Sequence, residues 1–313
     1  MAQTLTMAAL FKALLEPLWE RLLRGAPRKI DAVPRFTGIS LALGGGFARG
    51  FAHLGVLRVL EEEHIPIACI AGTSVGSILG AAYASGAPLE RIIAVCREVR
   101  LKDFSRWSIS KMGLASNERM GELIRKWFRA LRFEQMRIPL AVVATDLGTG
   151  EAYVFRSGEV VTAVRASCAY PGMFQPVMHG NRCLADGGLV APVPTQAVAA
   201  MGAGCVVGVN VGFNNWNGSA PKNVFQVVAR AINAAQKHHE RAWERFADLM
   251  IEPDVHSIEW DSFDRADEII RAGEDAARRA LPRLRELLRG ERSSSAHTTA
   301  GQRWTETPAA PMP

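Results

Sequence analysis

Residues 38–86 of the chain read GISLALGGGFARGFAHLGVLRVLEEEHIPIACIAGTSVGSILGAAYASG. A short apolar run (38–43) precedes a Gly-rich turn and an amphipathic run (52–63). The same order then repeats, with an apolar run (67–71), a second turn and an Ala- and Gly-rich run (75–85). Short apolar runs bounded by glycine are typical of buried strands, and the longer runs have helical periodicity. The stretch therefore predicts a β-α-β-α start.

The rest of the chain continues this alternation. Continuous apolar runs are typical of strands buried on both faces, and amphipathic runs are typical of the helices that cover them. We expect two more strands and four more helices: strands at 139–146 and 205–211, and helices at 160–168, 194–201, 223–247 and 264–288. The last helix is expected to begin with Asp264 as its N-cap. Together these elements predict an α/β fold with a mostly parallel central sheet.

Composition divides the chain into a large body and two flanking segments. The body is expected to span residues 37–290, and a hydrophobic content of 48% in 313 residues is ample for a core. Residues 291–313 are rich in Ser, Thr, Ala and Pro, which predicts a disordered tail. Residues 1–36 are predicted to form an amphipathic helix followed by a linker with two prolines.

The N-terminal segment has the leucine spacing of an amphipathic helix. Charged residues (Lys12, Glu16 and Glu20) interrupt it, so residues 1–24 are expected to be neither a signal peptide nor a membrane span. Its apolar positions recur at helical spacing: Leu10, Leu14, Leu15, Leu18, Leu22 and Leu23. Such a helix suits peripheral contact with a membrane, and it suits equally packing on the body or on a second subunit of a homo-oligomer.

Charge and cysteine content narrow the choice of partners. The formal net charge of +6 favours anionic partners such as lipid headgroups or nucleic acid. Nucleic acid is disfavoured, because the 37 Lys and Arg residues are dispersed among 31 acidic residues without a recognition motif. The five cysteines form no CxxC pair, and no His and carboxylate groups have ligand spacing. We therefore expect no disulfide framework, metal or cofactor, and the reduced thiols fit a cytoplasmic protein.

A serine lies between the second predicted strand and the following helix, in the pentapeptide GTSVG (72–76). A serine in a tight strand-to-helix turn needs neighbours with almost no side chain, and Gly72 and Gly76 meet that need. The helix that begins at Val75 is expected to direct its N–H groups and the positive end of its dipole at the hydroxyl. We interpret Ser74 as the nucleophile of an acyl-transfer site.

The Gly-rich turn GGGFARG (44–50) has two interpretations. A dinucleotide fingerprint needs glycine where Arg49 stands, and the Lys-Ser/Thr of a P-loop is absent, so nucleotide binding fits poorly. Consecutive N–H groups before a helix suit an oxyanion hole, here predicted to consist of Gly45, Gly46 and Phe47. Gly44 and Gly50 are expected to shape the turn. Arg49 either braces the loop through hydrogen bonds to carbonyl groups or is an ordinary surface arginine.

Asp186 is the candidate base. It follows a short strand-like run and precedes Gly187 and Gly188, so its carboxylate is expected on a constrained loop at a strand end. A carboxylate with a reference pKa of about 3.9 is a weak base. It acts best when it is partly desolvated and directly hydrogen-bonded to Ser74.

Histidine is the alternative base. The order Ser74, Asp186, His256 matches the nucleophile, acid and histidine order of α/β-hydrolases. His238 and His239 are further candidates. No sheet-end pattern surrounds His256, which favours a base other than this histidine.

Together, these motifs resemble the patatin-like phospholipase family, and its bacterial members in particular. The matching blocks occur in order between residues 38 and 281: LALGGGFARGFAHLGVLRVLEE, IAGTSVGSILGAAYASG, AVVATDLGTGE, ASCAYPGMFQPV, LADGGLVAPVPTQAVAAMGA and, more loosely, IEPDVHSIEWDSFDRADEIIRAGEDAA. The resemblance implies a three-layer α/β/α fold that acts on acyl esters of lipids. It also implies a Ser74–Asp186 dyad without histidine, with residues 44–50 as the oxyanion hole.

The Gly-rich loop departs from the pattern G-G-G-x-R-G of the family. When Arg49 and Gly50 are aligned, Phe47 stands where a third glycine is often found. Its N–H still serves the oxyanion hole if its φ is negative, and its ring is placed to line an acyl channel.

Two functions of different classes follow. The first is a serine acyl hydrolase that cleaves acyl esters of phospholipids or other lipids through an acyl-serine intermediate. The alternative is a catalytically idle patatin-like domain that binds lipid or a membrane as an adaptor. Basic charge and the N-terminal helix favour the adaptor, whereas the intact Ser74 and Asp186 favour the enzyme.

Overall fold

The computed structural model describes residues 38–100, 103, 106–110, 113–202, 204–212, 220–221 and 224–290. The predicted N-terminal helix and linker (1–36) and the predicted tail (291–313) lie outside these ranges. So do the side chains of His238 and His239.

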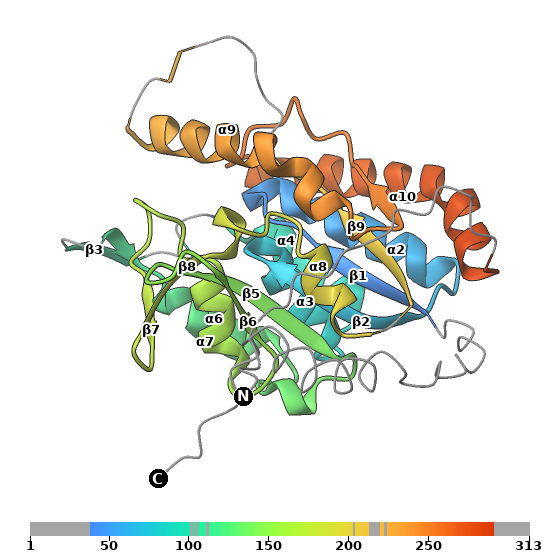
Figure 1. The fold of residues 1–313 in the computed structure, drawn as a ribbon, viewed down its shortest axis with the longest axis horizontal. Coiled ribbons are helices and arrows are strands. Elements are labelled where there is room, and N and C mark those ends of the chain that lie inside the picture. The colour runs from blue at the N-terminus through green and yellow to red at the C-terminus, as the bar shows by residue number, and fades with distance from the viewer. Residues whose placement is uncertain are drawn as a thin grey trace, which may run out of the picture. The chain divides into compact units, whose positions relative to one another are not determined.

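An eight-stranded sheet forms the centre of the described body (Figure 1): β1 (Ile39–Leu43), β2 (Ile67–Thr73), β5 (Leu140–Asp146), β6 (Ala152–Phe155), β7 (Val177–His179), β8 (Arg182–Asp186), β9 (Cys205–Val209) and β10 (Leu249–Ile251). The strand order is β10-β9-β1-β2-β5-β8-β7, and β6 also pairs with β5. Five strands (β1, β2, β5, β9 and β10) pair in parallel, whereas β6 and β8 are antiparallel to β5, and β7 to β8. A separate antiparallel pair consists of β3 (Arg106–Ser110) and β4 (Gly113–Ser116).

The described α-helices are α2 (Ala52–Glu62), α3 (Val75–Ala84), α4 (Leu89–Glu98), α6 (Glu118–Trp127), α7 (Val160–Ser167), α8 (Thr195–Ala199), α9 (Val224–Glu244) and α10 (Ala266–Leu288). Helices α2 and α10 pack against each other beside the sheet (Figure 1). Three other helices pack on the strands of the sheet. Helix α3 contacts β2 and β5, α7 contacts β5, and α8 contacts β1, β2 and β9.

The side chains of β1 show that both faces of the sheet are buried. Ile39, Leu41 and Leu43 belong to a large core with α2, α3 and α10, and Ala42 belongs to a smaller core with Val198 of α8. Because successive side chains of a strand point to opposite faces, the two cores lie on opposite sides of the sheet. The predicted three-layer α/β/α fold with a mostly parallel sheet is confirmed.

One predicted helix start is wrong. The helix expected from residue 264 begins at Ala266, with Arg265 as its N-cap, and Asp264 lies in the preceding 3₁₀ turn (Phe263–Arg265). Phe263 is buried, and its ring meets the edge of Phe51 at 5.7 Å. This aromatic contact fixes the entry of the chain, so the capping preference of Asp264 does not decide where the helix begins.

Strand register brings the predicted catalytic residues to one level of the sheet. Thr73, the last residue of β2, pairs with Val143 of β5, and Ala144 pairs with Asp186 at the end of β8. Ser74 is the residue after Thr73, and Ala144 is the residue after Val143. Ser74 therefore lies level with Ala144 and with its partner Asp186. The register of β8 on β5 therefore places Asp186 near the carboxyl end of the parallel strands, level with Ser74.

Candidate active site

Ser74 occupies a strained turn between β2 and α3. Its φ of 52° and ψ of −126° are unusual for a residue with a side chain. The turn is possible because its glycines touch backbone: a Cβ on Gly76 would lie 2.1 Å from the Leu43 carbonyl oxygen, and one on Gly72 would lie 2.5 Å from Ser77 Cα. The turn therefore has the geometry that the GTSVG motif predicts.

Hydrogen bonds around Ser74 hold this turn. Its N–H donates to Ser167 Oγ at 2.8 Å, and the Ser167 hydroxyl donates to the Val143 carbonyl at 2.6 Å. Ser77 Oγ donates to the Ser74 carbonyl at 2.6 Å. Since these bonds satisfy the backbone of Ser74, they fix the position of its side chain.

The Ser74 hydroxyl donates a hydrogen bond of 2.8 Å to Asp186 Oδ2. The other carboxylate oxygen, Oδ1, accepts the Gly188 N–H at 2.8 Å. Asp186 is only 3% exposed, and this burial raises the pKa of its carboxyl to about 7, although both hydrogen bonds act in the opposite direction. A carboxylate with this pKa is a far better base near neutral pH than a solvated aspartate.

Two buried side chains hold the Gly-rich loop. Arg49 is 1% exposed, and its Nε donates to the Ile258 carbonyl at 2.7 Å. A buried arginine bonded to a carbonyl group is what bracing of the loop predicts. His53 of α2 is fully buried and bonds to the Gly44 carbonyl at 2.8 Å through Nε2. Burial lowers the pKa of His53 to about 4, so the ring is neutral near pH 7 and donates its Nε2–H to this carbonyl.

The predicted donors of the oxyanion hole differ in their surroundings. Gly45, Gly46 and Phe47 all line a cavity with Ser74. However, Gly45 donates its N–H to the Pro192 carbonyl at 3.0 Å, so this N–H is engaged within the protein in the present structure. The φ of Phe47 is 51°, so the negative φ on which its role as a donor was made conditional is not found. This is the left-handed region that favours glycine, the residue often found at this place in the family pattern.

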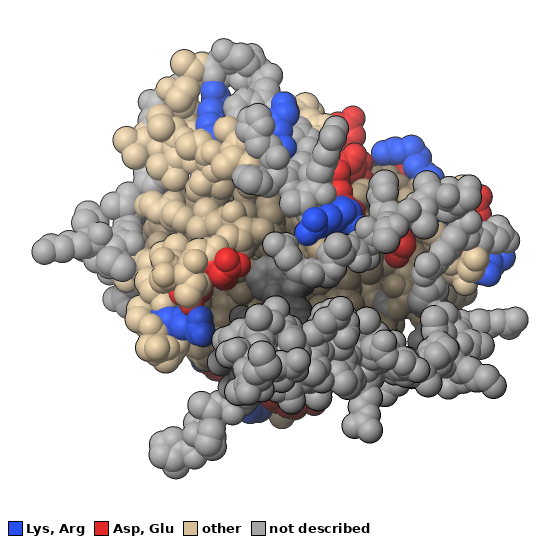
Figure 2. Space-filling model, viewed as in Figure 1, with Lys and Arg blue, Asp and Glu red and all other residues tan. Residues whose placement is uncertain are grey.

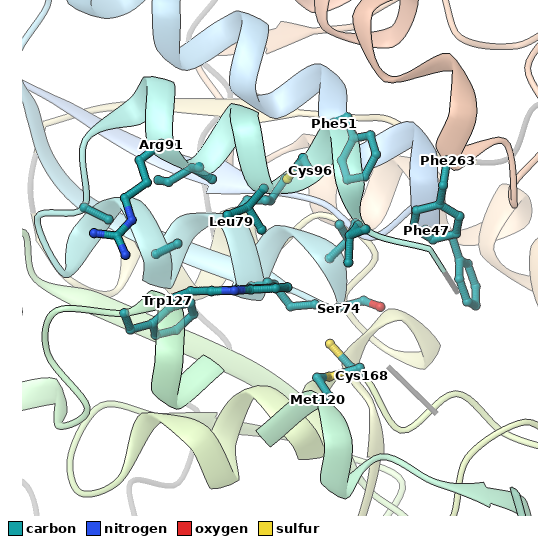
Figure 3. Close-up of a pocket in the computed structure, with 18 of the residues that line it drawn as sticks. Phe47, Phe51, Ser74, Leu79, Arg91, Cys96, Met120, Trp127, Cys168 and Phe263 are labelled. Atoms are coloured by element: carbon teal, nitrogen blue, oxygen red, sulfur yellow. The ribbon is translucent and has the colours of Figure 1, made fainter. Parts of the chain in front are cut away.

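An apolar cavity begins at Ser74. Figure 3 shows Ser74 near Phe47 at one end, with Arg91 toward the opposite end. Its walls are almost entirely apolar and come mainly from the helices α3, α4 and α6: Val75, Ile78, Leu79, Ala82, Ile92, Val95, Met120, Trp127 and Phe128. Phe47 also lines it, as its sequence position predicted. A cavity of this kind suits a fatty acyl chain.

A second cavity also contains Ser74. It contains Asp186 and carries polar side chains from three separate segments: Tyr170, Asn210, Asn233 and Gln236. Gln236 of α9 donates its Nε2–H to the Gly188 carbonyl at 2.5 Å, which ties α9 to the loop after Asp186. The two cavities share Ser74 and Phe47 among their described lining residues.

The alternative histidine base is not brought to the serine. His256 is exposed, and it is not among the described residues that line either cavity. The structure therefore does not favour the alternative base, because His256 lies in an exposed turn.

Several residues of the site were not predicted from the sequence. Nothing in the patterns pointed to Ser167 or Gln236, because both act through contacts between distant segments. His53 had a signal: it lies on the face of the predicted helix that otherwise presents Val56, Leu57 and Leu60. A polar ring on an apolar face close to a Gly-rich loop indicates a buried hydrogen bond.

Residues 41–199 match the family model for patatin-like phospholipase. The chain belongs to the patatin-like phospholipase family. The match contains Ser74, Asp186 and the complete Gly-rich loop, which are the parts of the site that the geometry brings together.

Members of this family with clear sequence similarity include mycobacterial and fungal proteins. The uncharacterized NTE family protein Rv1063c of Mycobacterium tuberculosis is 34% identical over 188 residues, which is 55% of this chain and 49% of that protein. A second such protein, Rv2565, is 31% identical over 278 residues, or 80% of this chain and 48% of that protein. Lysophospholipase NTE1 of Mycosarcoma maydis is 35% identical over 180 residues, or 56% of this chain and 10% of that protein. The chain thus spans about half the length of the mycobacterial relatives.

Among solved structures, VipD from Legionella pneumophila matches with a TM-score of 0.49 and 13% identity. The match covers 80% of this chain and 67% of that chain. At this distance the similarity adds nothing to the assignment of the chain to the patatin-like phospholipase family.

None of the helices within the described ranges has both the length and the apolar character needed to cross a membrane. In the same ranges, His, Cys, Asp and Glu residues form no group of three that could hold a metal ion. Figure 2 shows basic and acidic side chains interspersed on the visible face of the molecule.

Proposed function

We propose that the protein is a serine acyl hydrolase that cleaves acyl esters of lipids through a Ser74–Asp186 dyad. The observation that carries this proposal is the 2.8 Å hydrogen bond from Ser74 Oγ to Asp186 Oδ2, at the junction of an apolar and a polar cavity. Membership of the patatin-like phospholipase family supports it, as does the name lysophospholipase given to one relative.

The first chemical step forms an acyl-serine. Asp186 accepts the hydroxyl proton of Ser74 as the serine oxygen attacks the ester carbonyl. The proton then passes from Asp186 to the oxygen of the departing alcohol as its bond to the acyl carbon breaks. In the second step the same carboxylate takes a proton from water as the water oxygen attacks the acyl carbon. The bond from the acyl carbon to Ser74 Oγ then breaks, Asp186 returns the proton to Ser74 Oγ, and the fatty acid leaves.

The Gly-rich loop and the start of α3 are proposed to stabilise the oxyanion. Gly46 lines the polar cavity beside Ser74, and α3 begins at Val75, directly after the nucleophile. The positive end of a helix dipole favours negative charge at this position. His53 and Arg49 contribute indirectly, because their bonds to the Gly44 and Ile258 carbonyls fix the loop.

The two cavities are proposed to divide the substrate at the ester bond. The apolar cavity takes the acyl chain, since nearly all of its wall is hydrocarbon. The polar cavity takes the alcohol, since it contains hydroxyl and amide groups near Asp186. A substrate placed in this way has its carbonyl at Ser74.

The proposal is tested by measuring hydrolysis of a medium-chain acyl ester and a lysophospholipid by four proteins: the wild type, Ser74→Ala, Asp186→Asn and His256→Ala. We expect the first two variants to lose at least about 10⁴-fold in kcat and His256→Ala to keep its activity. Because burial disfavours the charged form of Asp186, the Asn variant is expected to unfold at no lower a temperature than the wild type at mildly alkaline pH.

Each other result has a defined meaning. Loss of activity in a folded His256→Ala would exclude the dyad and require a triad. Full activity in Ser74→Ala would exclude the serine mechanism. No hydrolysis by the wild type would favour the lipid-binding adaptor.

A further inference from the structure

Tyr170 is a residue of the polar cavity for which the mechanism above has no role. It follows α7 and lies beside the catalytic aspartate, because the Asp186 N–H donates to the carbonyl of the adjacent Ala169 at 3.0 Å. Its ring meets the ring of Phe47 in an edge contact, with 5.2 Å between the ring centroids and an interplanar angle of 67°. Backbone and ring are therefore both held in place.

The hydroxyl of Tyr170 is buried, and it has no hydrogen-bond partner within the described part of the chain. A buried hydroxyl without a partner costs free energy, and such groups in folded proteins are few. Neither of the other two tyrosines has a buried hydroxyl without a partner. Tyr83 donates to Glu61 Oε1 at 2.9 Å, and Tyr153 is half-buried, with the Arg182 guanidinium 5.2 Å from its ring centroid. Tyr170 is thus the tyrosine whose hydroxyl is kept at a cost to stability.

The position of Tyr170 matches one part of the proposed substrate. Tyr170 lines the polar cavity with Ser74 and Asp186, but it is not among the described residues of the apolar cavity. Burial and the charge of Asp186 raise the pKa of Tyr170, so the group keeps its proton throughout the reaction. It is a permanent hydrogen-bond donor on the alcohol side of the ester.

We propose that the Tyr170 hydroxyl donates a hydrogen bond to the leaving oxygen of the ester while the acyl-serine forms. This inference rests on the proposed function. As the bond between Ser74 Oγ and the acyl carbon forms and the bond to the alcohol breaks, negative charge develops on the alcohol oxygen. Asp186 supplies the proton that this oxygen finally takes, and Tyr170 stabilises the charge without giving up its own proton.

A leaving-group donor matters only when the leaving group is poor. An alkyl alcohol, such as the glycerol of a lipid, carries its developing charge on a single oxygen. A para-nitrophenolate spreads the charge over its ring and needs little help. Two esters with the same acyl chain therefore distinguish this role from a general effect on the fold.

The experiment compares Tyr170→Phe with the wild type and with Tyr153→Phe as the matched control, on a monoacylglycerol and on the para-nitrophenyl ester of the same acid. We expect Tyr170→Phe to lower kcat/KM for the monoacylglycerol about 100-fold, and that for the nitrophenyl ester less than about threefold. Tyr153→Phe should leave both values unchanged. The unfolding midpoint of Tyr170→Phe should be equal to or above that of the wild type, because no hydrogen bond of the protein is lost.

Three results would overturn the inference. Equal loss on both esters, or no loss on either, would show that the hydroxyl does not act on the leaving oxygen. A lower unfolding midpoint would show that the hydroxyl has a structural partner. Ser74→Ala, run in the same assay, separates this from the proposed function: its inactivity leaves the serine mechanism standing whatever Tyr170→Phe shows.

Discussion

The two cavities at Ser74 are built from opposite chemistry. The larger one is lined by side chains of α3, α4 and α6 and is almost wholly apolar. The smaller one is lined by the Gly-rich loop, by the segment around Asp186 and by α9, and it presents hydroxyl and amide groups. Ser74 and Phe47 belong to both.

This difference shows how the strained turn at Ser74 can border an apolar and a polar cavity at once. The apolar side needs only volume and hydrocarbon, which helices in the core provide. The polar side needs hydrogen bonds with defined directions, and these come from segments far apart in sequence, such as Gln236 and Gly188. A change in the apolar wall should therefore alter chain-length preference, whereas a change in the polar wall should alter the chemical step.

The largest expected effect lies at the junction and concerns pH. Because Asp186 must be ionised to act as a base and its pKa is about 7, kcat/KM should fall below this pH by about tenfold per pH unit. Two units below, the loss is about 100-fold, and it should be equal for short-chain and long-chain esters. Above the pKa the rate should reach a plateau. A profile that stays flat down to the ordinary pKa of an aspartate would contradict the raised pKa.

Ala82→Phe should reduce the space in the apolar cavity and leave the polar cavity unchanged. Ala82 lies eight residues after Ser74, roughly 12 Å along α3, and it lines the apolar cavity. A phenyl ring there should shorten the space for the acyl chain and lower kcat/KM for long-chain esters by about tenfold or more, with little effect on a short-chain ester. The matched control is Ala94→Phe on the exposed face of α4. Equal losses on both chain lengths would mean that this cavity does not hold the acyl chain.

Gln236→Ala should affect the polar side by a smaller amount. The hydrogen bond to the Gly188 carbonyl positions the loop that also donates to Asp186. Its loss should lower kcat by about two- to tenfold at every chain length, with KM little changed. The neighbouring Lys237→Ala, at an exposed position, serves as control. A chain-length-dependent effect would show that α9 contacts the acyl chain instead.

The smallest effect is expected in the backbone of Phe47. A φ of 51° costs glycine less conformational free energy than any residue with a Cβ. Phe47→Gly should therefore be more stable to unfolding than Phe47→Ala by about 1 kcal/mol, the reverse of the usual order of Gly and Ala. Denaturant unfolding of both variants measures this difference. Greater stability of the Ala variant would mean that the loop relaxes once the ring is removed.

Local sequence patterns were sufficient for most of the fold and for the turn that holds Ser74. The apolar runs before and after the Gly-rich turn became β1 and β2, and the GTSVG motif became the turn at Ser74, because turn geometry depends on neighbouring residues. The start of α10 could not be predicted in this way. It depends on the contact between Phe263 and Phe51, which are distant in sequence.

The polar side of the site was harder to predict for the same reason. Whether the Gly45 N–H is available depends on the Pro192 carbonyl, and the state of the Tyr170 hydroxyl depends on every segment around it. No local pattern records such contacts. The sequence could name Asp186 because Gly187 and Gly188 mark a turn, but its burial and raised pKa follow from the packed structure.

The central claim is that Asp186 activates Ser74. Its most direct test is the rate of labelling by a fluorophosphonate, with the modified residue located by peptide mapping, in the wild type and in Asp186→Asn across a range of pH. We expect a single label on Ser74, a labelling rate that rises with pH to a plateau above about 7, and slow labelling of Asp186→Asn at every pH. A label on another residue, or equal labelling rates in the two proteins, would contradict the account.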